Sequence, residues 1–179
     1  MTSWEPIGPK ADDDARADRY REVNEGIERM LAEEPDWIGA MATVVCELHH
    51  AFGYFDWTGF YRLVEPELLI VGPYQGTHGC LRIPFERGIC GSAARQRKTE
   101  WVDDVTERSD HIACSSTTVS EVVIPVETPE GDLLAVLDVD SDTPAVFSAV
   151  DVHHLEELCG WLGERYGSGE AAKQRSGQV

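Results

Sequence analysis

The chain has 179 residues, 42% of them hydrophobic, which suits one domain with a sizeable core and argues against a disordered protein. Its 33 acidic residues outnumber its 15 basic ones and give a net charge of −18, so we expect neither a nucleic acid nor a membrane partner, because phosphates and anionic lipids repel such a surface. No basic segment followed by an apolar run opens the chain, and no stretch approaches the about 18 apolar residues of a membrane span. We therefore expect a cytoplasmic protein.

Two helices are predicted near the start of the chain. Residues 1–14 are expected to form a flexible N-terminal arm that ends in an acidic helix-capping signal. From Ala15 to Glu33 apolar residues recur at helical spacing, which predicts the first helix. A second apolar stripe predicts another helix after Pro35, and Gly53 is expected to end it.

The pattern then changes to that of strands, which we predict at 56–64, 67–74, 80–85, 101–102, 120–127 and 132–140. A short helix from about Ile89 to Gln96 interrupts them. Residues 103–118 form an irregular stretch rich in Asp, Ser and Thr, and long loops of this kind inside compact domains are usually functional.

The last predicted element is a helix that Ser148 caps and that runs to about Tyr166. Residues 167–179 are expected to be a disordered tail. The element order predicts one α+β domain over 15–166, with an antiparallel sheet and helices packed on it.

Five cysteines are present, and a reducing cytosol leaves them three usual roles: metal ligands, catalytic thiols or core packing. Cys46 and Cys159 lie inside predicted helices and are interpreted as structural. Cys80, Cys90 and Cys114 lie in loop-like or helix-start contexts and form no CxxC pair. This spacing favours thiol chemistry over a zinc site.

Each of these three thiols has its own argument. Cys90 follows Gly88 at a predicted helix start, where the helix dipole lowers a thiol pKa. Cys114 lies in the irregular stretch, three residues after His111, where a thiol can reach both a substrate and a partner. Cys80 starts a strand and suits a resolving role. The residues alone do not rank the three.

Carboxylates form a second candidate group. Strand alternation places Asp138 and Asp140 on one face with Leu134 and Val136, and Glu121 lies on the neighbouring predicted strand. Together the three carboxylates would attract an ammonium group. Carboxylates at a solvated strand end are an equally good interpretation of the pattern.

Aromatic residues form the third candidate group. Trp57 and Tyr61 alternate around Gly59, so one strand face is expected to show a trough between two rings. Such a box suits a methyl group or a sulfur atom. Packing of both rings in the core is the more frequent outcome for such a strand.

Taken together, these segments resemble the free methionine-R-sulfoxide reductases, a single-domain branch of the GAF fold. The resemblance covers about residues 20–162 and rests on the stretches 57–61, 72–76, 80–90, 110–114, 120–125 and 137–141. Two departures from the family pattern are Glu86, where the family has glycine, and the insertion of Asp142 and Thr143 before Pro144. Both concern loop geometry.

The resemblance implies reduction of free L-methionine (R)-S-oxide without a metal or organic cofactor. It implies that Cys114 is the nucleophile, Cys80 the main resolving cysteine and Cys90 an auxiliary thiol. A sulfenic acid and an intramolecular disulfide would be intermediates, and thioredoxin or a similar dithiol would reduce the disulfide. The oligomeric state stays open, with a homodimer among the alternatives.

The resemblance also implies roles for the other candidates. Glu121, Asp138 and Asp140 would bind the ammonium and sulfoxide ends of the substrate, and Glu121 would supply a proton. Trp57 and Tyr61 would surround its methyl group. Two alternative functions stay open: a GAF sensory or ligand-binding module, and a sensor that uses the same thiols for signalling.

The composition yields a prediction about stability. Only three basic residues are lysines, and the excess negative charge should destabilise the folded state at low ionic strength through self-repulsion. We expect Tm to rise clearly between about 0.05 M and about 2 M KCl, since the Debye length falls below about 3 Å above 1 M. Thermal melts at both concentrations measure this. A flat response would support an ordinary acidic surface over adaptation to a salt-rich cytoplasm.

Overall fold

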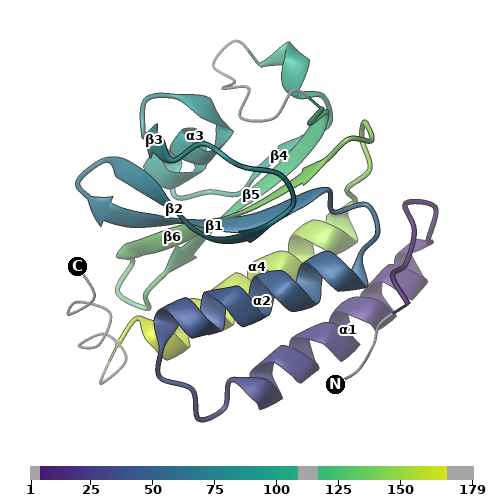
Figure 1. Ribbon diagram of the computed structural model, residues 1–179, viewed down its shortest axis with the longest axis horizontal. Coiled ribbons are helices and arrows are strands. Elements are labelled where there is room, and N and C mark those ends of the chain that lie inside the picture. The colour runs from purple at the N-terminus through teal and green to yellow at the C-terminus, as the bar shows by residue number, and fades with distance from the viewer. Residues whose placement is uncertain (1–4, 109–116, 169–179) are drawn as a thin grey trace.

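The computed structural model describes residues 5–108 and 117–168, which form one six-stranded antiparallel sheet with helices on both faces (Figure 1). The strand order is β3-β2-β1-β6-β5-β4. The strands are β1 (Trp57–Glu65), β2 (Leu68–Gln75), β3 (Arg82–Pro84), β4 (Glu100–Val102), β5 (Ser120–Glu127) and β6 (Leu133–Ser141). The helices are α1 (Asp13–Met30), α2 (Trp37–Ala51), α3 (Gly88–Gln96) and α4 (Ala149–Tyr166), with a 3₁₀ turn at Val105–Glu107.

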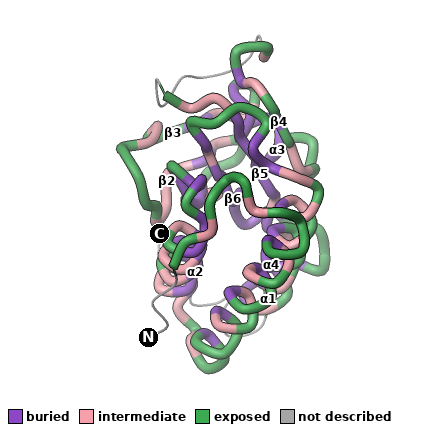
Figure 2. Tube along the Cα trace, turned by 90° about the vertical axis from the view of Figure 1, so that its right-hand side faces the viewer, coloured by how far each residue is buried: buried purple, intermediate pink, exposed green. Residues whose placement is uncertain are grey.

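The helices divide unequally between the two faces of the sheet. Helices α2 and α4 pack on one face, and α1 packs against α2 and α4 (Figure 1). Helix α3 packs on the opposite face, against β3, β4, β5 and β6. Figure 2 shows that the buried residues follow the inner sides of these layers. The predicted α+β class and antiparallel sheet are confirmed.

Polar side chains start the three long helices, as predicted for the first and the last of them. Asp12 accepts from the Ala15 amide at 2.9 Å to cap α1, and Asp36 caps α2 in the same way. Ser148 caps α4 in a reciprocal arrangement with Asp151. These caps satisfy amide groups that have no partner inside the helix.

Some element boundaries differ from the predicted ones. Helix α1 begins at Asp13, inside the expected arm, and ends at Met30, where Leu31 forms the C-cap. The described part of the arm is hydrogen-bonded to the domain: the Ile7 amide donates to the Ala51 carbonyl at 3.0 Å, and the Gly53 amide donates to the Ile7 carbonyl at 2.8 Å. Tertiary hydrogen bonds of this kind leave no periodic signal in the sequence.

Two clusters of buried residues lie on opposite faces of the sheet. The helix-face cluster, beneath α1, α2 and α4, includes Phe60, Leu137 and Cys159. The site-face cluster, beneath α3, includes Tyr61 and Val136. The buried position of Cys159 fits its predicted structural role.

The predicted alternation along β6 is wrong at its first two positions, because Leu133 lies in the site-face cluster and Leu134 in the helix-face cluster. Leu134 belongs to the helix-face cluster, whereas Val136 and Asp138 face the other way. A register shift between Val126 and Glu127 is the reason, because it inserts one extra residue into β6 opposite β5. The alternation that positions Asp138 and Asp140 begins after this bulge.

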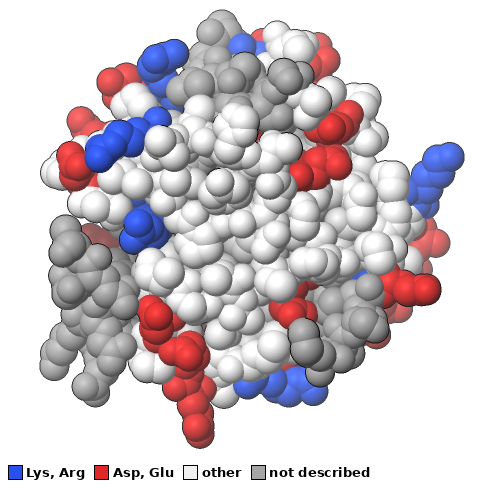
Figure 3. Space-filling model, viewed as in Figure 1, with Lys and Arg blue, Asp and Glu red and all other residues white. Residues whose placement is uncertain are grey.

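Charged residues on the face seen in Figure 3 lie mostly around its edge, with acidic side chains in several separate places. Some acidic residues of the described chain form ion pairs with arginines, including Glu127 with Arg97 at 2.9 Å and Glu65 with Arg82 at 3.5 Å. In the described ranges 5–108 and 117–168, no helix has the length and apolarity needed to cross a membrane.

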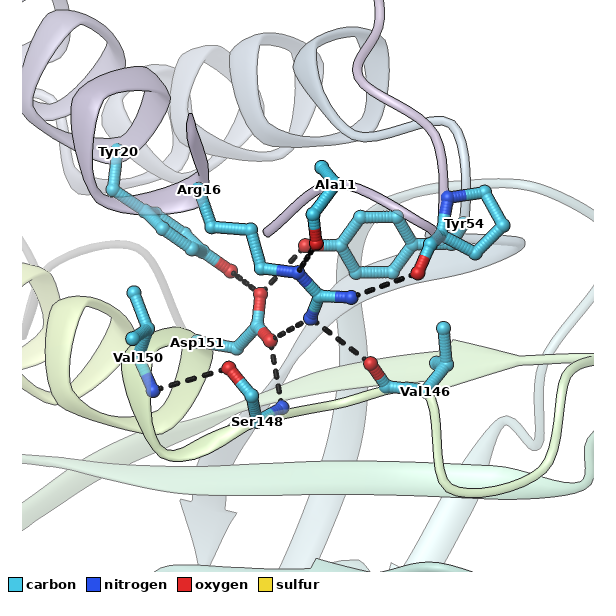
Figure 4. A network of polar contacts seen from close by, with 9 residues as sticks. Ala11, Arg16, Tyr20, Tyr54, Val146, Ser148, Val150 and Asp151 are labelled. Carbon is cyan, nitrogen blue, oxygen red and sulfur yellow. Dashed lines mark hydrogen bonds and ion pairs between the residues drawn. The ribbon is translucent and has the colours of Figure 1, made fainter. Parts of the chain in front are cut away.

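A buried ion pair fixes α1 against α4 (Figure 4). The guanidinium of Arg16 donates to the carboxylate of Asp151, which is fully buried. The same carboxylate accepts from the hydroxyls of Tyr20 at 2.9 Å and Tyr54 at 2.6 Å, and from the Ser148 amide at 2.7 Å. Both oxygens of the Asp151 carboxylate therefore accept hydrogen bonds. The donors lie on α1, on the segment between α2 and β1, and at the start of α4.

Arg16 is held as completely as its partner. Its guanidinium donates to the carbonyls of Val146, Pro9 and Ala11 at 2.9, 3.0 and 3.2 Å. It also lies over the Tyr54 ring, 4.7 Å from the centroid. The network thus joins the N-terminal segment, α1 and the start of α4.

Removal of this carboxylate should destabilise the fold strongly. In Asp151→Asn, Arg16 keeps a buried charge without its counterion, and breaking such a pair costs about 3–5 kcal/mol. Since each kcal/mol lowers Tm by about 2–4 °C for a chain of this size, thermal melts should show a fall of roughly 6–20 °C.

The matched control is Asp18→Asn, which breaks the exposed pair between Asp18 and Arg21. Exposed pairs contribute about 0–1 kcal/mol, so its Tm should stay close to that of the wild type. Equal Tm values for both variants would contradict a stabilising role for the buried network.

Candidate functional site

Three carboxylates gather on the site face because of how β6 pairs with its neighbours. Asp140 lies opposite Trp57 of β1 and opposite Glu121 of β5. Asp138 lies one row further along, opposite Gly59. Residues paired in this way on one face have neighbouring side chains. We call Glu121, Asp138 and Asp140 the carboxylate cluster.

Helix α3 brings a thiol to this cluster. The Cys90 thiol donates to Oδ2 of Asp138, with 3.2 Å between the two atoms. Gly91 allows α3 to pack closely against the end of β3, because a Cβ there would lie 2.6 Å from the Pro84 carbonyl oxygen. One ligand-type atom each from Cys90, Asp138 and Glu121 lies within 4.8 Å of the other two.

Burial makes this arrangement electrostatically costly. Glu121, Asp138 and Cys90 are 6%, 5% and 4% exposed, and Asp140 is half-buried. Within the described residues, Oδ1 of Asp138 has no hydrogen-bond partner. Charged groups in such surroundings need an opposite charge or a bound proton.

The pKa values of the cluster follow from this burial. Burial raises the pKa of Asp138 to about 7, against the opposing effect of the hydrogen bond from Cys90. Burial, together with repulsion from Asp138 and Asp140, raises the pKa of Glu121 well above its ordinary value. The pKa of Asp140 rises for the same reasons, burial first and Asp138 second. Protons are therefore shared within the cluster at neutral pH.

The helix-start argument for Cys90 is wrong in its sign. Burial raises the pKa of the Cys90 thiol well above its ordinary value, and the negative charges of Asp138 and Glu121 raise it further. Cys90 does lie in the first turn of α3, as predicted. The helix dipole acts there on a group that is desolvated and surrounded by carboxylates, and these larger effects decide the protonation state.

Arg108 is a functional candidate that the sequence analysis missed. Its positive charge lowers the pKa of Glu121 and so partly opposes the effect of burial. It also pairs with Glu100 on β4, with 2.9 Å between Nη1 and Oε2. The sequence feature that could have indicated Arg108 is its position in the irregular stretch 103–118, because long loops of this kind are usually functional.

Aromatic rings extend the site along β1 and β2. Trp57 stacks against Tyr61 and against Tyr74, with ring centroids 5.7 and 5.4 Å apart. A Cβ on Gly59 would lie 2.5 Å from the Trp57 ring and from Tyr74, so the indole lies over this glycine. The Trp57 indole itself thus fills the predicted trough between Trp57 and Tyr61. Tyr74, the second ring that stacks on Trp57, was not predicted from the sequence.

The segment that carries Cys80 is anchored on this aromatic stack of Trp57, Tyr61 and Tyr74. Nε1 of Trp57 donates to the Thr77 carbonyl at 2.9 Å. A Cβ on Gly79 would lie 2.8 Å from the Tyr61 hydroxyl, so only glycine permits this close approach.

Of the predicted site residues, the carboxylate cluster, Cys90 and Tyr61 lie together. Burial raises the pKa of Tyr61, and it is raised further because Tyr61 lies near the charges of Asp138, Cys90, Asp140 and Glu121. Cys80 packs at the margin of the site-face cluster and is disulfide-bonded. The predicted nucleophile, Cys114, lies outside the described residues, as does His111. The arrangement offers a shared pool of protons, negative charge for a cationic ligand, and thiols nearby.

Comparisons with known proteins show the family to which the chain is similar. The family model of the GAF domain matches residues 38–163. The free methionine-R-sulfoxide reductase of Escherichia coli (strain K12) is 32% identical over 80% of this chain and 86% of that protein. The protein of the same name from Saccharomyces cerevisiae is 36% identical over 69% of this chain and 72% of its own length.

A solved structure provides the corresponding comparison of folds. It is the free methionine-R-sulfoxide reductase from Neisseria meningitidis in complex with its substrate. The two chains are 39% identical, and the match covers 97% of this chain and 99% of that one with a TM-score of 0.84.

The raised pKa of Asp138 predicts a pH dependence of stability. The folded chain holds a proton on Asp138 up to about pH 7 that the unfolded chain loses near pH 4, so this group makes stability fall as the pH rises through that window. In Asp138→Asn this contribution is absent. The difference in Tm between about pH 5 and about pH 8 should therefore narrow by at least roughly 4 °C.

Asp132→Asn is the control, because Asp132 is exposed in the turn between β5 and β6. It should keep the full pH dependence of the wild type. An unchanged pH dependence in Asp138→Asn would contradict the raised pKa.

Proposed function

The chain belongs to the free methionine-R-sulfoxide reductases, a family of GAF-domain proteins, and we propose that it reduces free L-methionine (R)-S-oxide to L-methionine with its own thiols. The observation that carries the proposal is the buried carboxylate cluster, which lies against Cys90 and beside the aromatic stack. A free amino acid with a cationic end, a polar sulfoxide and a methyl group suits these three surroundings.

The carboxylate cluster would bind the ammonium group of the substrate. Asp138 and Asp140 supply negative charge, and a cation beside them would favour their ionised forms and release the protons that burial retains. A peptide-bound methionine has no such ammonium group. A bound peptide would therefore leave the buried carboxylates without a counterion, which costs free energy of binding. This cost would make the site selective for the free amino acid.

The chemical step needs a nucleophile and an acid. The thiolate of Cys114 would attack the sulfoxide sulfur while Glu121, with its raised pKa, gives a proton to the oxygen. This attack would form a transient bond between the two sulfur atoms. The oxygen would then pass to the Cys114 sulfur as the transient bond and the substrate's sulfur–oxygen bond break, so that methionine leaves with its sulfur reduced and Cys114 becomes a sulfenic acid. Trp57 and Tyr61 would contact the methyl group and orient the sulfur.

The second half of the cycle regenerates the thiols. The Cys80 thiol would attack the sulfenic sulfur of Cys114, which releases water and forms a disulfide between the two residues. The disulfide-bonded state of Cys80 supports its role as the resolving cysteine. Thioredoxin or a similar dithiol would then reduce this disulfide by exchange.

Cys90 would be an auxiliary thiol in this scheme. It is protonated, buried and hydrogen-bonded to Asp138, so it is a poor nucleophile. Its proton would instead limit the negative charge of Asp138 in the absence of substrate.

Turnover with separated epimers tests the proposal. NADPH consumption, coupled through thioredoxin reductase and thioredoxin, should follow addition of the free R-sulfoxide. The S epimer and a peptide-bound sulfoxide should be nearly inert, because one fixed ammonium site presents only one face of the sulfoxide to the nucleophile. Equal rates for both epimers, or no turnover with the free sulfoxide, would contradict the proposed function.

Cysteine variants provide the matched controls for this assay. Cys114→Ser should release no methionine even in a single turnover, because no sulfenic acid can form. Cys80→Ser should release one methionine per chain and then recycle poorly. Cys46→Ser should behave as the wild type, because Cys46 lies on α2, on the other face of the sheet. Loss of the first turnover in Cys90→Ser alone would move the nucleophile to α3.

A further inference from the structure

We propose that Cys90, Glu121 and Asp138 form a binding site for a divalent cation of the Zn²⁺ type, and that this site shares Asp138 with the position of the ammonium group of the substrate. The metal would not take part in the reduction. It would instead prevent the substrate from binding to the carboxylate cluster, and it would be a ligand of the protein other than the substrate.

The three side chains converge from three different elements. Cys90 comes from α3, Glu121 from β5 and Asp138 from β6. In tetrahedral zinc sites the ligand atoms are about 3.3–3.6 Å apart, since Zn–S bonds are about 2.3 Å and Zn–O bonds about 2.0–2.2 Å. The sulfur of Cys90 and Oδ2 of Asp138 are already 3.2 Å apart, and the Glu121 oxygen lies within 4.8 Å of both. Small side-chain rotations would complete the geometry.

An unsatisfied atom at this place points independently to a ligand. Oδ1 of Asp138 has no hydrogen-bond partner in the described part of the chain, although the residue is only 5% exposed. A buried carboxylate oxygen without a partner carries a large desolvation cost. A cation held between Asp138 and Glu121 would remove this cost and their mutual repulsion.

The donor set decides the class of metal. One thiolate with two carboxylates suits Zn²⁺, or Co²⁺ as its spectroscopic substitute, whereas Mg²⁺ and Ca²⁺ require oxygen ligands throughout. Binding would displace the Cys90 proton to solvent, as thiol ligation does in other zinc sites. Three protein ligands leave a fourth position for water or for the neighbouring Asp140.

A second group of possible ligands allows a direct comparison. His153, His154 and Glu157 also have ligand atoms within 4.8 Å of one another, on the surface of α4. This group lacks a thiol, and nitrogen atoms of His153 and His154 lie 3.5 and 2.9 Å from the carboxylate oxygens of Glu157. Any metal bound there would show no sulfur coordination.

Cobalt absorption spectroscopy provides the test. The variant with Cys80→Ser and Cys114→Ser keeps Cys46, Cys90 and Cys159, so neither proposed catalytic thiol can bind the metal. Titration of this chain with Co²⁺ should produce a thiolate-to-cobalt charge-transfer band and intense tetrahedral d–d bands that saturate at one ion per chain. Added Zn²⁺ should abolish both. Absence of the charge-transfer band would overturn the proposal.

Further substitutions in the same background locate the site. Cys90→Ala should remove the charge-transfer band, and Asp138→Asn should weaken Zn²⁺ binding by at least about 100-fold, because even outer-shell changes cost about 10–100-fold. Asp138→Asn keeps the side-chain volume, so it serves as the test if Cys90→Ala is poorly folded by circular dichroism. Cys46→Ala and His153→Gln should leave the band unchanged. Loss of the band in Cys46→Ala, with retention in Cys90→Ala, would overturn the assignment.

The overlap with the ammonium position rests on the proposed function and has its own readout. Free L-methionine should compete with Zn²⁺ in equilibrium dialysis of the same chain. Zinc binding that depends on Cys90 but is unaffected by methionine would contradict the proposed ammonium position while supporting the metal site. Failure of the two proposals is thus distinguishable.

Discussion

The pairing register of β1, β6 and β5 is the constraint on which the rest of the site depends. Because side chains alternate between the faces of a strand, a shift of one residue would turn Asp138 and Asp140 toward the helix-face cluster. The bulge at Leu134 in β6, opposite Val126 and Glu127, changes this alternation beyond the site, so that Leu134 packs under the helices while Asp138 still faces α3. The sheet thereby separates an apolar core from a polar site within one set of strands.

Two buried carboxylates on opposite faces of this sheet have opposite surroundings. Asp151 accepts four hydrogen bonds, one of them from its ion-pair partner Arg16, so its charge is satisfied without any ligand. Among the described residues, Asp138 accepts a hydrogen bond from Cys90 on one carboxylate oxygen, and its other oxygen has no partner. The first arrangement stabilises the contact between α1 and α4. The second favours any ligand that brings a positive charge, which is how a binding site differs from a structural ion pair.

Cys90 and Cys80 differ in their surroundings, and this difference determines how reactive each sulfur atom is. A cysteine in the first turn of α3 lies near the positive end of a helix dipole, yet Cys90 remains protonated because burial and two carboxylates act on it more strongly. Cys80 lies at the margin of the site-face cluster, on a segment held by the Trp57 indole. In the proposed cycle, the disulfide of Cys80 would exchange with an external dithiol.

Hydrophobic periodicity and capping residues determined the order, type and approximate length of the elements, because these features act over a few neighbouring residues. Within β6, alternation alone placed Asp138 and Asp140 on one face. Only the tertiary structure decided what lies around them: the strand register opposite Trp57 and Glu121, the approach of Cys90 from α3, and the proximity of Arg108. The sign of the Cys90 pKa shift followed from those neighbours. Burial and Coulomb interactions depend on distances between residues far apart in the chain, and no local pattern in the sequence encodes them.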